Sequence, residues 1–309
     1  MDIISIILIV LGLVLFETVS SIDNAIINAQ VLSTMKEWAR RWFLLWGLII
    51  GVFLVRGILP FIIVWVTNTS LSPIEVITAT FSNDPHVLEA IESSSPILLI
   101  GGGTFLIFLF FHWLFMEPKR FGLRGEGFFM RQGIWFYAVI SVILTLIVWF
   151  CLKVNPFMAL GAVVGSTAFF ITHGFKQNAE AAEEKLLKSN QSDISKIFYL
   201  EVIDATFSID GVLGAFAFTL SIPLILLGNG LGALVVRQVT VSNIDRIKKY
   251  VYLKNGAMYS ILFLGLIMVL EAFGAPIPPW VSPVITFGVV GYFFLKSRIE
   301  LNRNPSVST

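Results

Sequence analysis

The chain has 309 residues, of which 56% are hydrophobic and only 13% are charged, and its formal net charge at pH 7 is +1. This composition excludes an ordinary water-soluble globule, because there are too few polar side chains to cover its surface. It also provides no basic face for nucleic acid, which we do not expect as a partner. With one cysteine, Cys151, the chain can form neither an internal disulfide nor a thiolate metal cluster.

Apolar segments long enough to cross a bilayer recur along the chain. Hydropathy predicts spans at 3–31, 42–66, 97–116, 134–152, 156–175, 197–220, 222–241, 256–273 and 280–296. The expected fold class is therefore all-α, a polytopic transmembrane helix bundle of about nine helices. The first apolar run lacks the basic start and the cleavage site of a secretory signal, so we interpret it as a retained helix.

Basic residues are concentrated in alternate loops. All but three of the 21 Lys and Arg residues lie on one side of the predicted membrane, the exceptions being Lys153, Arg56 and Arg237. The positive-inside rule assigns that side to the cytoplasm. We therefore expect a multi-pass protein of the plasma (inner) membrane, with the N-terminus outside and the C-terminus in the cytoplasm.

An internal repeat relates the first and sixth predicted spans. Residues 17–23 and 204–210 both read acid-x-x-x-Ser-Ile-Asp, and each motif is followed by Gly-x3-Gly-x4-Arg, at 47–56 and 228–237. Spans that are five apart cross the membrane in opposite directions, so the repeat is expected to be inverted. We divide the chain into a first transmembrane repeat (1–152, spans 1 to 4), a connector with span 5 (153–196) and a second repeat (197–309, spans 6 to 9).

Five carboxylates lie inside two predicted spans, where an uncompensated charge costs several kcal/mol. Arg56 and Arg237 can supply supporting charge for two of them at most. Ion pairs that merely hold the bundle together are the structural alternative. The candidate metal ligands all offer oxygen, which suits hard cations such as Mg, Ca or Mn. They are Glu17, Ser21, Asp23, Asn24, Glu201, Asp204, Ser208 and Asp210.

The helical spacing divides these residues between faces. Glu17, Ser21 and Asn24 share one face of a regular helix, whereas Asp23 and Asp210 lie off the face of the first acid in each motif. Convergence on one ligand would require both helices to unwind at Ser-Ile-Asp, as the discontinuous helices of transporters do. Asp23 and Asp210 are then predicted to meet near mid-membrane. The same acids could also form a proton relay.

Other polar and small residues in the spans are assigned interfacial or helix-packing roles. His112 and His173 lie near predicted cytoplasmic span ends and Glu271 near an outer one, so we interpret all three as interfacial residues outside the site. The Gly-x3-Gly pairs and the triple glycine at 101–103 are typical of positions where helices pack closely.

At these motifs the sequence resembles the TerC family of integral membrane proteins, whose hallmarks look like Glu-x3-Ser-x-Asp-Asn and Asp-x-x-Phe-Ser-x-Asp-Ser. The matching residues are Glu17, Ser21, Asp23 and Asn24, and Asp204, Phe207, Ser208 and Asp210, with Gly211 where the family usually has Ser. The resemblance implies a role linked to metal ions. Manganese export is the best-defined activity of that family, and tellurite (tellurium) resistance is its historical name.

The leading hypothesis is a membrane transporter, not an enzyme, that exports a hard divalent cation, manganese first, through a carboxylate site shared by two inverted repeats. The metal ion is the substrate, and we expect no cofactor. Besides the lipid bilayer, a homo-oligomer or membrane-protein partners are compatible with the sequence. The alternative is a membrane accessory factor for metallation or assembly of partner proteins. An intramembrane aspartyl hydrolase ranks last, because its Gly-x-Gly-Asp element is absent.

Overall fold

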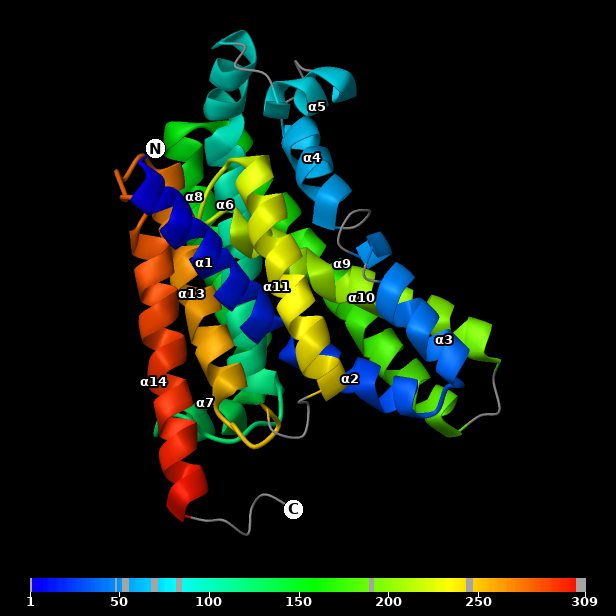
Figure 1. Ribbon diagram of the computed structural model, residues 1–309. Coiled ribbons are helices and arrows are strands. Elements are labelled where there is room, and N and C mark those ends of the chain that lie inside the picture. Colours follow the sequence, from blue (N-terminus) through cyan, green and yellow to red (C-terminus); the bar gives the residue numbers. More distant parts are fainter. Residues whose placement is uncertain are drawn as a thin grey trace.

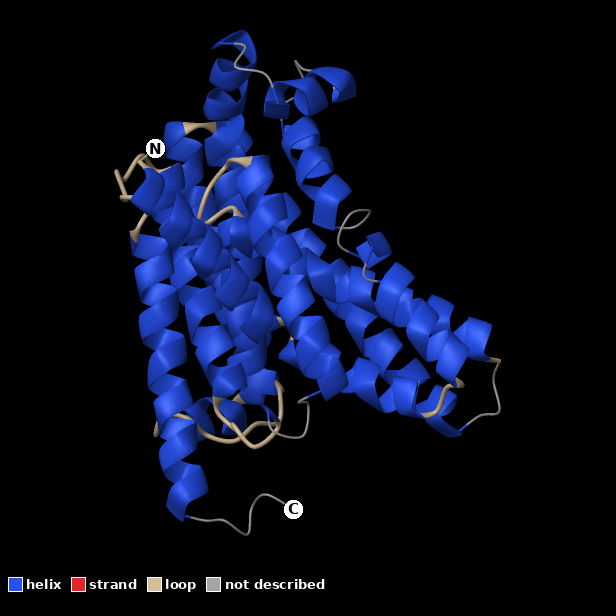
Figure 2. Cartoon of the chain, in the orientation of Figure 1, coloured by secondary structure: helices blue, strands red, loops and turns tan. Residues whose placement is uncertain are grey.

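The computed structural model describes residues 2–47, 49–51, 56–67, 72–81, 85–188, 192–242 and 247–303. Within these residues every regular element is a helix and no strand occurs (Figure 2). The elements are, in chain order, α1 (Ile3–Ser20), α2 (Ile22–Ser33), α3 (Glu37–Trp42), the π-helix η1 (Phe43–Gly47), α4 (Arg56–Thr67), α5 (Pro73–Phe81), α6 (Pro85–Met116), α7 (Glu126–Arg131), the 3-10 helix η3 (Gly133–Trp135), α8 (Phe136–Val154), α9 (Pro156–Lys188), α10 (Asp193–Ala215), α11 (Ile222–Ser242), α13 (Leu253–Ala272) and α14 (Val281–Arg303).

The first predicted span is broken at its motif, which is the break that a shared site would require. α1 ends at Ser20 and α2 begins at Ile22, so Ser21 is the junction between two helices. Asp23 lies in the first turn of α2, where a carboxylate interacts favourably with the helix dipole. Figure 1 shows α2 running sideways from the end of α1 towards α3 and the adjoining parts of α9 and α10.

The break that a shared site would require in the sixth span is absent. α10 continues without interruption through Ser208, Ile209 and Asp210. The Ser208 hydroxyl donates to the backbone carbonyl of Asp204, 2.5 Å away, which is a bond within the helix. Gly211 packs against α1, because a Cβ at this position would lie 2.6 Å from Glu17 Oε2. This glycine therefore serves a close helix approach and not an unwound segment.

Five segments of the described chain are long and apolar enough to cross a membrane, namely Ile3–Ser20, Ser93–Met116, Gly133–Val154, Pro156–Asn178 and Leu253–Ala272. Two shorter apolar helices, Arg56–Val66 and Ile222–Gln238, fall at the second and seventh predicted spans. α10 and α14 fall at the other two. The architecture is thus an all-α polytopic bundle, while the number of nine spans and the inverted repeat stay predictions.

α6 is the central helix of the bundle, and it packs between α9 and α13. Its Trp113 is fully buried in the largest apolar core. Glycines bring the neighbouring backbones close: a Cβ on Gly165 of α9 would lie 2.1 Å from the Gly101 carbonyl oxygen, and one on Gly103 would lie 2.8 Å from the Gly265 carbonyl oxygen of α13. Glycines of the 101–103 triple therefore serve helix packing, as the sequence predicted.

The contact between Gly101 and Gly165 predicts the effect of one added methyl group. Gly165→Ala should force α6 and α9 apart, because the new Cβ meets backbone atoms that cannot turn aside, at a cost of about 1–3 kcal/mol. Thermal unfolding of the detergent-purified protein measures this loss. Gly174→Ala on the same helix meets open space and is the matched control. Equal melting temperatures for the two variants would contradict the packing assignment.

Candidate functional site

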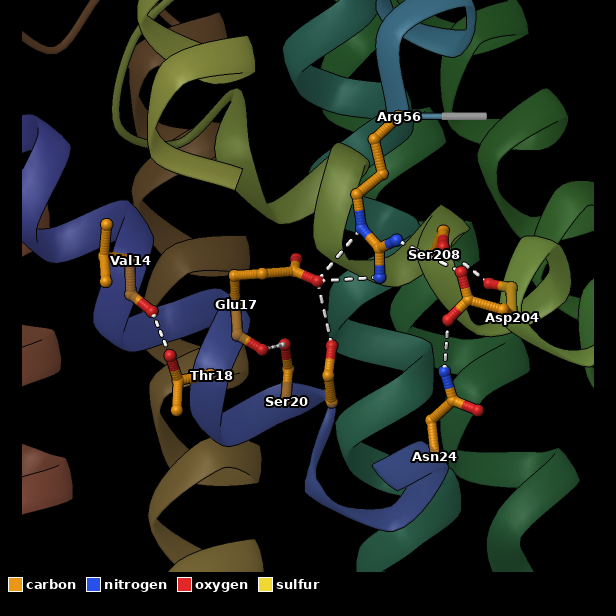
Figure 3. A network of polar contacts seen from close by, with 9 residues as sticks. Val14, Glu17, Thr18, Ser20, Asn24, Arg56, Asp204 and Ser208 are labelled. Atoms are coloured by element: carbon orange, nitrogen blue, oxygen red, sulfur yellow. Dashed lines mark hydrogen bonds and ion pairs between the residues drawn. The ribbon is translucent and has the colours of Figure 1, made fainter. Parts of the chain in front are cut away.

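Arg56 joins an acid from each copy of the repeat at a buried position (Figure 3). Its Nη2 and Nε lie 2.8 and 3.0 Å from Glu17 Oε1, and its Nη1 lies 3.3 Å from Asp204 Oδ2. Arg56 is 4% exposed and Glu17 is 1% exposed. Because these charges are withdrawn from water, loss of one partner would leave an uncompensated buried charge.

Two further residues of the first motif complete this network. Ser21 Oγ donates to Glu17 Oε1 over 2.9 Å, and Asn24 Nδ2 donates to Asp204 Oδ1 over 2.6 Å (Figure 3). All three residues of this predicted face thus reach the network, although the helix that was expected to carry them is broken at Ser21. Since the chain changes direction at Ser21, Asn24 can reach across to α10 while Glu17 stays beside Arg56.

A cavity of about 60 Å³ adjoins the network. Its wall includes Ser21, Asn24, Asn28, Arg56 and Asp204, and such a volume accommodates a few water molecules. The side-chain oxygens of Asn24 and Asn28 are buried there without a hydrogen-bond partner among the described residues. Buried acceptors without donors are costly, so the cavity is chemically suited to a ligand that carries positive charge or N–H and O–H groups.

The glycine pairs provide room for the acids of the opposite repeat. A Cβ on Gly51 would lie 2.4 Å from Asp204 Oδ2, and a Cβ on Gly232 would lie 2.6 Å from Glu17 Cβ. Gly51 and Gly232 are equivalent in the repeat, as are Glu17 and Asp204. The two contacts are therefore reciprocal: each copy supplies a glycine against the acid of the other. Helix packing alone, the role inferred from the sequence, is an incomplete account of these glycines.

Glu201 adds a third carboxylate beside the cavity. It lies one turn before Asp204 on α10 and faces Gly47, where an added Cβ would lie 2.3 Å from Glu201 Oε1. This oxygen is buried and has no hydrogen-bond partner within the described part of the chain. Gly47 is the last residue of η1 and lines the cavity. A buried carboxylate of this kind either binds a compensating positive charge or takes up a proton.

Arg237 lines the same cavity but forms no ion pair with any described residue. The expectation that it neutralises an acid is therefore not met, because its repeat equivalent Arg56 holds both Glu17 and Asp204. Glu17, Glu201 and Asp204 outnumber the two arginines by one. With all three carboxylates ionised, the neighbourhood of the cavity carries one net negative charge even when Arg237 is counted.

The prediction that Asp23 and Asp210 meet at a shared site is wrong, because each of them forms an ion pair with a lysine instead. Asp23 Oδ2 lies 2.8 Å from Lys254 Nζ, and Asp210 pairs with Lys176. Both acids lie off the face that carries the first acid of their motif, and lysines from α13 and α9 supply the countercharge instead. The Ser208 hydroxyl is likewise committed to the α10 backbone.

The predicted set of eight ligands therefore separates. Glu17, Asn24 and Asp204 belong to the network, with Ser21 as a donor to Glu17 and Glu201 beside it. Among the described residues, no group of three or more His, Cys, Asp or Glu side chains is arranged to hold a metal ion. In the conformation seen here, Arg56 occupies the position between the two acids.

Sequence reasoning missed a second polar cluster. His112 is only 7% exposed, and its ring centroid lies 3.8 Å from that of His173. Glu117 and Lys254 pair next to it. Lone histidines carry a weak signal, because their proximity depends on the packing of α6 against α9. The signal that the sequence did offer for this cluster was the presence of lysines and a glutamate within about one turn of the predicted span ends.

A family model described as a protein of unknown function (DUF475) matches residues 22–304, which is most of the chain. Comparison with curated proteins and with solved structures gave no match. The matched residues contain four of the five candidate membrane spans and the whole second acidic motif, but of the first motif they contain Asp23 and not Glu17 or Ser21. The chain is therefore a multi-pass membrane protein that belongs to the DUF475 family.

Proposed function

We propose that this protein is a membrane transporter of a hard divalent cation and that Glu17, Asn24 and Asp204 bind the cation. One observation carries the proposal: acids from both copies of the repeat share a single buried guanidinium beside a cavity. Inverted-repeat transporters place their substrates near the bilayer midplane, between the repeats. Carboxylate and amide oxygens are the ligands that Mg, Ca and Mn prefer.

Arg56 acts in this proposal as the internal substitute for the cation. It neutralises Glu17 and Asp204 while the site is empty, which avoids two unpaired buried charges. An entering cation displaces the guanidinium and exchanges one positive charge for two. Glu201, which has no hydrogen-bond partner for its buried Oε1, offsets the additional charge.

The finer assignments draw on the resemblance to the TerC family. That resemblance supports manganese as the substrate and export as the direction of transport. The distribution of Lys and Arg supports the plasma (inner) membrane orientation with a cytoplasmic C-terminus. The reciprocal contacts of Gly51 with Asp204 and of Gly232 with Glu17 support a transport cycle in which the two repeats exchange roles.

Neutralising an acid of the network should strongly reduce transport without unfolding the protein. We expect Asp204→Asn to reduce manganese flux into liposomes by about tenfold or more, since a hydrogen bond or ion contact to a charged group contributes roughly 1.5–3 kcal/mol. The amide keeps the shape of the side chain, and Asp193→Asn, at the far end of α10, is the matched control.

The accessory-factor alternative gives a different result. If purified wild type moves no metal, or if Asp204→Asn transports as fast as wild type, the transport site is wrong and a role in metallation or assembly of partner proteins replaces it.

The two arginines of the repeat should respond unequally to the same substitution. Arg56→Gln leaves Glu17 and Asp204 without countercharge and should destabilise the protein by about 3–5 kcal/mol. Arg237→Gln removes no ion pair to a described residue, so its melting temperature should stay close to wild type. Thermal unfolding of both variants in detergent measures the difference. Similar losses for the two would show that Arg237 also balances buried acids in the ground state.

A further inference from the structure

The polar cluster that sequence reasoning missed contains a buried histidine pair. His112 of α6 and His173 of α9 have ring centroids 3.8 Å apart, and the rings of Phe136 and Phe169 lie against them. The Gln177 side-chain nitrogen lies 3.0 Å from His173 Nε2. Two imidazoles this close in an apolar setting cannot both be charged, because like charges repel strongly at low dielectric.

The pair is one part of a series of neighbouring charged groups. His112 Nδ1 lies 3.6 Å from Glu117 Oε1, Glu117 Oε2 lies 2.7 Å from Lys254 Nζ, and the same nitrogen lies 2.8 Å from Asp23 Oδ2. His112 Nδ1 is buried and has no hydrogen-bond partner in the described chain. This nitrogen therefore faces a carboxylate, and a proton on the ring would draw the two groups together.

On the other side of the pair, α9 carries Lys176 one turn after His173, and Lys176 pairs with Asp210 of α10. The next charged neighbours are Lys119, after α6, and Glu126 of α7, which add one charge of each sign. Counting all seven ionised groups from the elements packed around the histidines, the acids exceed the lysines by one. One proton on the histidine pair brings the net charge of the cluster to zero, whereas a second proton would make it positive.

The two ends of this series of charged groups, Asp23 and Asp210, lie on the helices that carry the cation ligands. Asp23 directly precedes Asn24 on α2, and Asp210 lies on α10 together with Asp204. A positive charge on the histidines repels Lys176 and competes with Lys254 for Glu117, so it changes the pairing of both aspartates. Protonation of the pair is thereby linked mechanically to the helices that form the transport site.

We propose that the His112–His173 pair binds one proton and that this proton is the coupling ion exchanged for the divalent cation. The coupling rests on the transport function proposed above, whereas the proton site does not. Each cycle then loads one proton onto a ring nitrogen and returns it to water on the other side of the membrane. Breaking and reforming the lysine pairs of Asp23 and Asp210 accompanies each step.

Simultaneous measurement of manganese and proton movement in liposomes tests the coupling. In wild type, protons should move in the direction opposite to manganese, and the manganese flux should change when a pH gradient is imposed. His112→Gln and His173→Gln should reduce the accompanying proton movement to background and remove the response of manganese flux to the gradient. His86→Gln, at the third histidine of the chain, is the control and should behave as wild type.

Histidine-observed NMR on the His86→Gln protein tests the proton site by itself, because only the pair then remains. One proton should be taken up by the two rings together between about pH 8 and 5, and the second only below that range. Independent uptake of a proton by each ring in that range would overturn the site. Manganese flux without proton movement would overturn the coupling and leave transport intact, whereas absence of manganese flux would reject the transport function and the coupling together.

Discussion

The ion pairs of Arg56 are the constraint on which the rest of the site depends. Glu17 is in the first copy of the repeat and Asp204 in the second, and both would be prohibitively costly in an apolar interior without a shared countercharge. The guanidinium can serve both because its donors form a planar fork. α1, α4 and α10 are consequently held together by electrostatics at a point where glycines have removed the intervening side chains.

The molecule contains two charge clusters with different compositions. The cluster at Arg56 is deeply buried and has more acid than base, so it favours a cation. The cluster at Lys254 and Glu117 lies at span ends, where the Lys254 side chain is 38% exposed and its pairs are correspondingly weaker. Because the pairs of Lys254 are the more exposed, they can rearrange at a smaller cost than the pairs of Arg56. α10 contributes an acid to both clusters and connects them.

Much of this organisation could be predicted from the sequence, and the failures have physical causes. Hydropathy locates helices because lipid requires apolar runs, and the polar motif at Glu17, Ser21 and Asn24 indicates the network although the helix breaks at Ser21. The motif of α10 looked equally breakable, yet Ser208 could satisfy its hydroxyl within the helix. The ion-pair partners of Asp23 and Asp210 were the main feature that the sequence did not predict. The lysines that neutralise these acids come from helices distant in sequence, and the periodicity of a sequence carries no information on such contacts.

The reciprocal glycine contacts also bear on how this molecule can change over evolutionary time. A side chain larger than hydrogen at Gly51 is tolerated only if Asp204 shortens or moves, and the same dependence ties Gly232 to Glu17. Each half therefore sets the permitted size of residues in the other. Neither glycine can therefore be enlarged without a compensating change at the acid of the other half.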